Sequence, residues 1–168
     1  MNAIATIEAM IPALRRYARG LLGSVQDADD LVHDALVDAL GKLNPKHTLN
    51  DVQPWMFTIL RNRFISDQRR AKHRVNVVLD ENTAEMPVNC PNQDQGLQMR
   101  DLSLGLATLQ LEQREVLLLI TVEGFTYAEV AKMLDIPVGT VMSRLSRARD
   151  RLNDFMDGKT RPRLRSVL

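Results

Sequence analysis

Apolar residues recur at helical spacing near the C-terminal end of the chain. The spacing i, i+4, i+7, i+11 predicts a helix with one buried face, made by Val141, Leu145, Ala148 and Leu152. Upstream, Thr126 and Glu129 have the spacing of a capping box, which starts a preceding helix. Pro137 suits the first turn of the second helix, where its missing N–H costs nothing. We therefore predict a helix–turn–helix over residues 126–152.

The same periodicity dominates the rest of the chain and predicts an all-α fold. The expected helices run from about Ile11 to Leu22, from Ser24–Asp27 to Leu40 or Gly41, from Pro54 to Lys72, from Leu97 onward, and from Glu112 to Thr121. Alternating patterns are scarce, and Val75 to Leu79 is the only strand candidate. Prolines and polar residues break the period between Asn76 and Gln95, which indicates a linker.

This break divides the chain into two small helical domains joined by a flexible linker. We expect a first domain over residues 1–75, a linker over 76–96 and a second domain over 97–157, which contains the helix–turn–helix. Residues 158–168 form a basic segment with a proline, and we expect this tail to be disordered.

Charge is distributed unevenly along the chain, although its net value is only +1. Basic residues crowd the segments Arg61–Arg74 and Arg144–Arg165, and acidic residues crowd Asp27–Asp38. Two positive segments and one negative segment predict separate surfaces for different partners.

Composition argues for a reducing compartment and against membrane insertion or catalysis. Cys90 is the only cysteine, so no intrachain disulfide can form. The N-terminus lacks a secretory signal pattern, and the longest apolar run, Val116–Ile120, is far shorter than the roughly 20 residues of a membrane span. His33, His47 and His73 are scattered without ligand spacing, and no phosphate loop or nucleophile motif occurs. We expect a cytoplasmic protein that is not an enzyme and holds no metal or cofactor.

The second helix of the predicted helix–turn–helix carries polar residues away from its apolar face: Thr140, Ser143, Arg144, Arg147 and Arg151. Such a helix can lie in a DNA major groove, with its early residues at base edges and its arginines at phosphates. The alternative is an ordinary helical hairpin with a solvated basic face. The capping box, the short turn and the arginine face together favour DNA binding.

The helix expected from Pro54 has a second basic surface. Its core positions are Phe57, Leu60 and Phe64, and a different face carries Asn62, Ser66, Arg69 and His73. Trp55 opens this helix, and aromatic and polar groups beside arginines are typical of proteins that hold unstacked bases of single-stranded DNA. The alternative is that Trp55 is simply a large core residue.

Four carboxylates at helical spacing form an acidic stripe: Asp27, Asp30, Asp34 and Asp38. Like charges at this spacing destabilise an isolated helix by roughly 0.2–0.5 kcal/mol per pair. A basic protein surface as partner explains the arrangement, and a solvated acidic face is the alternative.

Taken together, four segments resemble the bacterial RNA polymerase sigma factors of the extracytoplasmic-function group. They are residues 27–34 (DADDLVHD), 54–62 (PWMFTILRN), 112–117 (EQREVL) and 136–144 (IPVGTVMSR), in the expected order and spacing. The pattern over residues 14–22 and 137–149 resembles the general-stress subgroup of alphaproteobacteria.

The resemblance implies a role for each charged surface. The acidic helix would dock on the β′ clamp of core RNA polymerase through Asp29, Asp30, His33 and Asp34, and the polymerase β flap would be a further contact. The −10 promoter element would be opened by the loop Asn44–Gln53 and bound by Trp55, Arg61, Asn62, Ser66, Arg69 and Arg70. The −35 element would be read by Thr140, Met142, Ser143, Arg144, Ser146 and Arg147. The chain would direct stress-response transcription, and an anti-sigma factor would clamp both domains to keep it inactive.

Two residues depart from the family pattern. His33 stands where glutamine is common and would make core binding mildly pH-sensitive, and Met142 stands where a basic residue is common. The second departure puts any promoter sequence borrowed from relatives in doubt. A sigma-like decoy that sequesters an anti-sigma protein without binding DNA is the alternative function. A dimeric repressor is a third reading, but the sequence has no dimerisation heptads.

Overall fold

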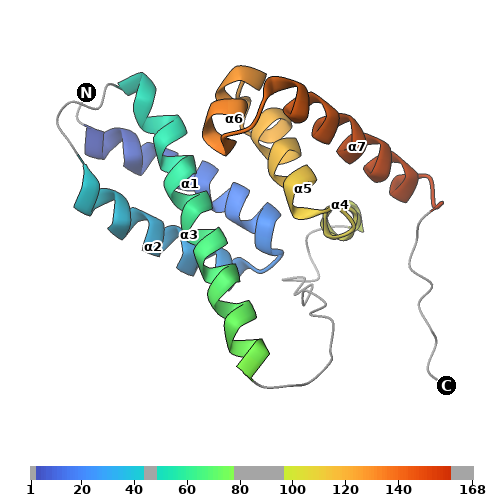
Figure 1. The fold of residues 1–168 in the computed structure, drawn as a ribbon, viewed down its shortest axis with the longest axis horizontal. Helices are drawn as coiled ribbons and strands as arrows, with labels where there is room; N and C mark the ends of the chain where they lie inside the picture. The colour runs from blue at the N-terminus through green and yellow to red at the C-terminus, as the bar shows by residue number, and fades with distance from the viewer. Residues whose placement is uncertain (1–2, 44–48, 78–96, 160–168) are drawn as a thin grey trace.

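The computed structural model describes residues 3–43, 49–77 and 97–159, and their regular structure is entirely helical (Figure 1). The helices are α1 (Ala3–Leu22), α2 (Val25–Lys42), α3 (Leu49–Val77), α4 (Leu97–Ala107), α5 (Leu111–Leu117), the π-helix η1 (Leu118–Val122), α6 (Tyr127–Leu134) and α7 (Val138–Met156). No strand occurs within the described ranges, and the predicted all-α class is confirmed. The first five residues of the predicted −10 loop, most of the predicted linker and the tail from residue 160 lie outside the described residues.

The helices α1, α2 and α3 pack against one another and form the first half of the molecule. The apolar stripe expected on α2 is buried, as are the three core positions expected on α3: Ala28, Leu31, Ala35, Ala39, Phe57, Leu60 and Phe64. Ser24 caps α2 because its hydroxyl accepts a hydrogen bond from the backbone N–H of Asp27 at 3.3 Å. Gly23 separates α1 from α2 with φ of +70°, a conformation that glycine adopts without steric cost.

Two predicted helix starts are wrong, because Pro12 and Pro54 lie inside α1 and α3 rather than at their beginnings. The turns before these prolines bury Ile7, Met10 and Val52 in the core. The packing of these side chains outweighs the preference of proline for the first turn of a helix.

The helix α3 also ends later than expected, at Val77. It therefore extends past the predicted end at Lys72 and two residues into the segment predicted as linker. The strand candidate Val75–Leu79 is wrong for its first three residues, which are helical.

The predicted helix–turn–helix is confirmed in the second half of the molecule. The capping box of α6 is complete, since the Thr126 hydroxyl accepts from the Glu129 backbone N–H while the Glu129 carboxylate accepts from the Thr126 backbone N–H at 2.8 Å. Asp135 ends α6 in the left-handed conformation, with φ of 54°. Pro137 is the N-cap of α7, one residue before the helix itself. The apolar face of α7 packs inward, with Val141, Leu145 and Ala148 buried.

The two halves lie against each other, which the sequence did not predict. The helix α1 contacts α5 and η1, and α3 contacts α6 (Figure 1). The rings of Phe57 and Phe125 meet edge to face, with centroids 5.1 Å apart. At Gly20 the backbone of α1 comes so close to η1 that an added Cβ would lie 2.7 Å from a terminal methyl group of Leu118.

Candidate functional site

The first candidate surface is the N-terminal half of α7. Of the residues expected at the −35 element, Met142, Ser143, Ser146 and Arg147 are exposed, and Thr140 and Arg144 are half-buried. These residues lie away from the buried apolar face of the helix. The arrangement leaves hydroxyl, thioether and guanidinium groups accessible along one helix, as major-groove recognition requires.

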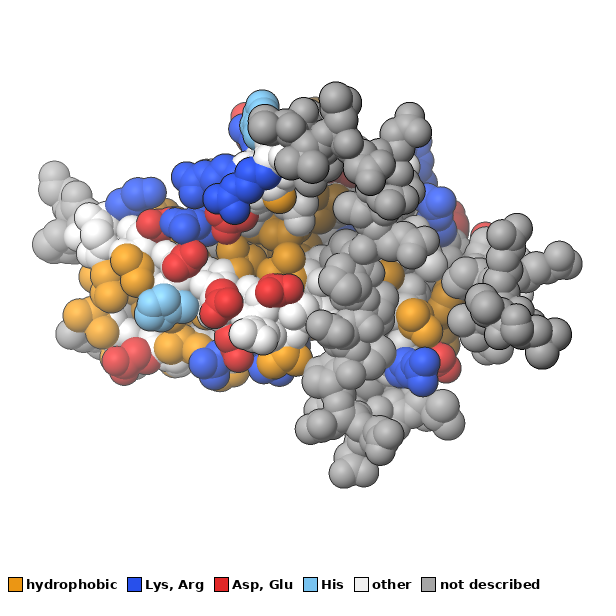
Figure 2. All heavy atoms as spheres, turned by 90° about the horizontal axis from the view of Figure 1, so that it is seen from below, with side chains coloured by type: hydrophobic (Ala, Val, Ile, Leu, Met, Phe, Trp, Pro, Cys, Tyr) orange, Lys and Arg blue, Asp and Glu red, His pale blue; other side chains and the backbone are white. Residues whose placement is uncertain are grey.

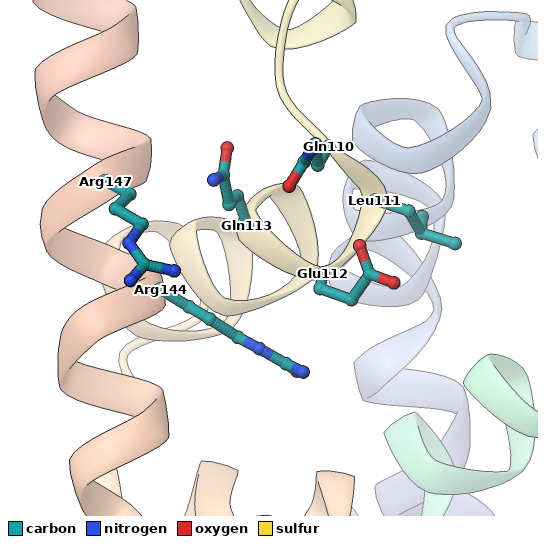
Figure 3. A pocket seen from close by; sticks show the side chains of 6 residues that line it. All are labelled: Gln110, Leu111, Glu112, Gln113, Arg144 and Arg147. Carbon is teal, nitrogen blue, oxygen red and sulfur yellow. The ribbon is translucent and has the colours of Figure 1, made fainter.

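A pocket lies beside this surface, where α7 faces the beginning of α5. Arg144 and Arg147 reach toward α5, and Gln110, Glu112 and Gln113 line the other side (Figure 3). The side-chain oxygen of Gln113 is buried and has no hydrogen-bond partner among the described residues. The two guanidinium groups can bind a phosphate at the pocket, with the Glu112 carboxylate opposing them. The two glutamines were not predicted at this site, because Gln110 and Gln113 precede the first residue of α7 by 28 and 25 positions.

The second candidate surface runs along α3. Asn62, Arg69 and Arg70 are exposed, and Ser66 is half-buried. Trp55 is also half-buried and packs against the hydrophobic core, so part of the residue is a packing contact and part remains accessible. One side of α3 therefore offers polar and cationic groups over about two helical turns.

Arg61 differs from the other residues expected at the −10 element, because it points at the second half of the molecule. Its Nε donates to a carboxylate oxygen of Glu115 at 3.0 Å, and one terminal nitrogen lies 3.5 Å from the other oxygen. The Glu115 side chain is only 1% exposed. Burial raises the pKa of this carboxyl group above its ordinary value, and the nearby Arg61 acts in the opposite direction. The structure thus separates Arg61 from the open surface on which Asn62 and Arg69 lie.

The third candidate surface is the acidic face of α2. Asp30 and His33 are exposed and have no ion pair within the described part of the chain. The other two residues expected to bind core polymerase are paired, Asp29 with Arg15 at 3.3 Å and Asp34 with Arg63 at 3.0 Å. Half of the expected docking residues are therefore partly neutralised within the molecule.

Arg63 of α3 is a central residue of this face that the sequence analysis did not single out. Its guanidinium contacts three carboxylates, Asp34 at 3.0 Å, Asp38 at 3.3 Å and Asp67 at 3.5 Å. Three negative charges around one positive charge leave the face acidic.

A groove between α2 and α3 adjoins this cluster, and acidic side chains gather there around exposed apolar atoms (Figure 2). Its acidic lining consists of Asp27, Asp30, Asp34 and Asp67, and its apolar lining includes Leu22, Leu31 and Phe64. A groove with an apolar floor and acidic walls suits a partner segment that carries both apolar and basic side chains.

The described residues show neither of two other kinds of site. They contain no group of three or more histidine, cysteine, aspartate or glutamate residues arranged to hold a metal ion. None of the described helices is long and apolar enough to cross a membrane. His47 and Cys90 lie outside the described residues.

Comparisons with known proteins match both halves of the chain. Residues 7–61 match the family model "Sigma2 domain of PhyR", and residues 99–152 match the model "Sigma-70, region 4". The ECF RNA polymerase sigma factor EcfG of Rhodopseudomonas palustris is 36% identical over 154 residues, which cover 90% of this chain and 84% of that protein.

Solved structures share the arrangement of the helices. The sigma factor RpoE of Bartonella quintana, solved in complex with the anti-sigma factor NepR, has a TM-score of 0.73 and 34% identity, over 92% of this chain and 96% of that chain. The PhyRSL–NepR complex of Sphingomonas sp. Fr1 has a TM-score of 0.70 over 97% of this chain and 95% of that chain. Its identity is 18%, so it supports the fold alone.

Proposed function

The chain belongs to the family of ECF RNA polymerase sigma factors, and on this premise we propose which of its surfaces perform promoter-specific transcription initiation. The observation that carries the proposal is the exposed polar and basic face of α7, in a helix–turn–helix whose capping, turn and core are all in place. Three surfaces take part, on α7, α3 and α2, and the first two bind DNA.

The face of α7 reads the −35 element. Met142, Ser143 and Ser146 lie at the positions that meet base edges, and Arg144 and Arg147 bind the phosphates on either side. Gln110 and Gln113 line the same pocket and add amide groups next to that backbone contact. Because Met142 contributes an apolar contact, the promoter favours a thymine methyl group at the facing base.

The exposed side of α3 holds the −10 element. Asn62 and Ser66 contact the bases of the separated strand, and Arg69 and Arg70 bind its phosphates. Trp55 lies on the same side and offers part of its ring for stacking. Arg61 joins this set only when it is released from Glu115.

The acidic face of α2 binds core RNA polymerase at the β′ clamp, through Asp29, Asp30, His33 and Asp34. Asp30 and His33 are exposed and form no ion pair with another described residue, which supports them as the main contacts. The second half of the molecule meets the β flap. We keep the domain boundaries expected from the sequence as part of this proposal, with a first domain over residues 1–75 and a second over residues 97–157.

An anti-sigma factor holds this chain inactive by contacting both halves. The likeness to a sigma factor solved with the anti-sigma factor NepR supports this part of the proposal. Inhibition of this kind suits a cytoplasmic regulator of stress-response genes. The protein acts through binding and not through a catalytic step of its own.

The test is transcription in vitro with core polymerase on a library of promoter fragments. We expect promoter-dependent initiation by the chain, and Asp30→Lys should weaken core binding about tenfold or more, because a like charge then faces the basic partner surface. The matched control is Glu8→Lys, the same charge change at an exposed position of α1. If both variants bind core equally well, the acidic face is merely solvated.

The same reagents separate a sigma factor from a decoy that never binds DNA. Each phosphate that the protein neutralises steepens the dependence of log K on log salt by about 0.9. Promoter binding by the polymerase-bound chain therefore tests the role of Arg69 and Arg147. If these arginines do not contribute to the slope of log K against log salt, the decoy is favoured.

A further inference from the structure

Gln113 of α5 has a polar side chain that the fold buries without giving it a partner. The residue is only 7% exposed, and its side-chain oxygen has no hydrogen-bond partner among the described residues. A buried acceptor that lacks a donor destabilises the folded protein, so its presence requires an explanation outside the fold. Gln113 lines the pocket between α5 and α7, and a donor can reach the oxygen from there.

The position of Gln113 is fixed by the start of α5. Its backbone N–H donates to the carbonyl oxygen of Gln110 at 3.1 Å, which closes the first turn of the helix. The helix α5 packs along α7, whose residues Val141 and Leu145 are buried. A side chain held on a packed helix has few orientations, so Gln113 offers its amide to the pocket in a defined direction.

The donors that face Gln113 across the pocket are the guanidinium groups of Arg144 and Arg147. A guanidinium carries five N–H donors and no acceptor, so it bonds to the oxygen of an amide and not to its nitrogen. Arg147 leaves α7 level with Gln113, whereas the Arg144 guanidinium extends away from the amide (Figure 3). Arg147 is exposed, and its guanidinium forms no hydrogen bond or ion pair with another described residue. Arg147 is therefore the better placed of the two donors.

An amide is suited to orient this arginine because it is neutral. Arg63 shows the opposite case, since three carboxylates surround its guanidinium and outweigh its charge. An amide oxygen can hold the Arg147 guanidinium through one N–H and leave the charge and the other donors available for a phosphate. A guanidinium held in this way also has fewer orientations in which it misses the phosphate.

We propose that Gln113 is a positioning residue for promoter recognition: when the −35 element binds, its amide oxygen accepts a hydrogen bond from Arg147 and directs the guanidinium to a DNA phosphate. The oxygen that has no partner in the free chain gains its donor in that complex. The hydrogen bond therefore adds to DNA affinity and not to the stability of the free protein. The inference rests on the proposed function, because it takes Arg147 as a phosphate-binding residue of the −35 surface.

The test replaces the amide by a side chain of similar size, Gln113→Met. The control is Gln26→Met, the same change at an exposed position of α2 that belongs to neither DNA-binding surface. The affinity of the chain in complex with core polymerase is measured on two promoter fragments, one with the −35 element and one in which that element is replaced. A hydrogen bond from a charged donor corresponds to a factor of about ten or more. Gln113→Met should therefore weaken binding about tenfold on the first fragment alone, and Gln26→Met should leave both affinities unchanged.

Two further measurements separate positioning from a structural role. In the Arg147→Met background, Gln113→Met should cause no additional loss of affinity, whereas in the Arg144→Met background the loss should remain about tenfold. Urea unfolding of the free full chain should give Gln113→Met a midpoint equal to or above that of the wild type, because the substitution removes a buried acceptor without a partner. A side chain that only supports the fold would give a lower midpoint and the same loss of affinity in both backgrounds.

Three results would overturn the proposal. They are an unchanged affinity of Gln113→Met for the fragment with the −35 element, an undiminished loss in the Arg147→Met background, and a loss that comes with a lower urea midpoint. In all three cases the wild-type chain still prefers the fragment with the element, so the proposed function stands. If the wild-type complex instead binds both fragments equally well, the proposed role of α7 is wrong, and this inference is wrong with it.

Discussion

Arg114 makes a strong and measurable prediction about stability. The residue is 5% exposed, and its guanidinium donates to carbonyl oxygens of both halves, Leu21 in the first and Leu109 in the second. Replacement by methionine keeps much of the side-chain volume but removes every donor. The carbonyl oxygens then remain buried without this partner.

The size of the effect follows from the geometry. Hydrogen bonds from a charged donor contribute about 1.5–3 kcal/mol each, so the two shorter bonds, at 2.9 Å and 3.1 Å, correspond to about 3–6 kcal/mol. The third, to Ala107 at 3.4 Å, adds little. Burial of the guanidinium opposes these bonds, as its lowered pKa indicates. We therefore expect Arg114→Met to lower the free energy of unfolding by about 3 kcal/mol, near the lower end of this range, which is a large part of the roughly 5–15 kcal/mol of a typical domain.

Urea unfolding with two probes tests this prediction. Trp55 is the only tryptophan and lies in the first half, whereas circular dichroism reports helix content of the whole chain. Because Arg114 joins the halves, both transitions should shift to lower urea together. The matched control, Arg100→Met, changes an exposed arginine of α4 and should stay within about 0.5 kcal/mol of the wild type. A loss below about 1 kcal/mol, or a Trp55 transition that does not move, would refute the reasoning.

Two other predictions concern the second half. Thr126→Ala removes the cap of α6 and should cost about 1 kcal/mol in urea unfolding at neutral pH. Hydrogen bonds from the Thr126 backbone N–H and hydroxyl lower the pKa of the Glu129 carboxyl, so the stability they contribute is present above its ordinary pKa and is lost as the pH falls through the lowered value. The difference between Thr126→Ala and wild type should therefore shrink in acid, and an unchanged difference would contradict this cause. Met142→Arg adds a cation to the exposed face of α7. If the new group binds a phosphate, the slope of log K for DNA binding against log salt should steepen by about 0.9. The control is the same substitution at Met156, which is exposed at the far end of α7.

Local patterns in the sequence predict most of this fold. The capping box, the turn before α7 and the buried faces of α2 and α7 all follow from residues within about twelve positions of one another. The same patterns place two helix starts too late, because proline favours the first turn of a helix. There the deciding contacts are tertiary, since Ile7 and Val52 are buried by other helices.

Contacts between the halves could not be predicted in this way. An arginine on the surface of an isolated helix has the same spacing whether it faces water, DNA or a distant glutamate. Arg61 and Glu115 are 54 positions apart, and Arg16 and Glu123 are 107 apart. The three carboxylates around Arg63 likewise come together only when α2 packs on α3. The charge map of the sequence therefore identifies candidate surfaces, and packing decides which of their charges remain available.

The absence of a side chain at Gly20 has an evolutionary consequence. A β-carbon at this position would lie 2.7 Å from a methyl group of Leu118. Any lineage that acquires alanine or serine there must therefore shorten or reorient Leu118 if it keeps the contact between α1 and η1. Paired substitution of these two positions across genomes would record the juxtaposition of α1 and η1 without a single new structure. Independent substitution at the two positions would mark descendants in which α1 and η1 no longer make this contact.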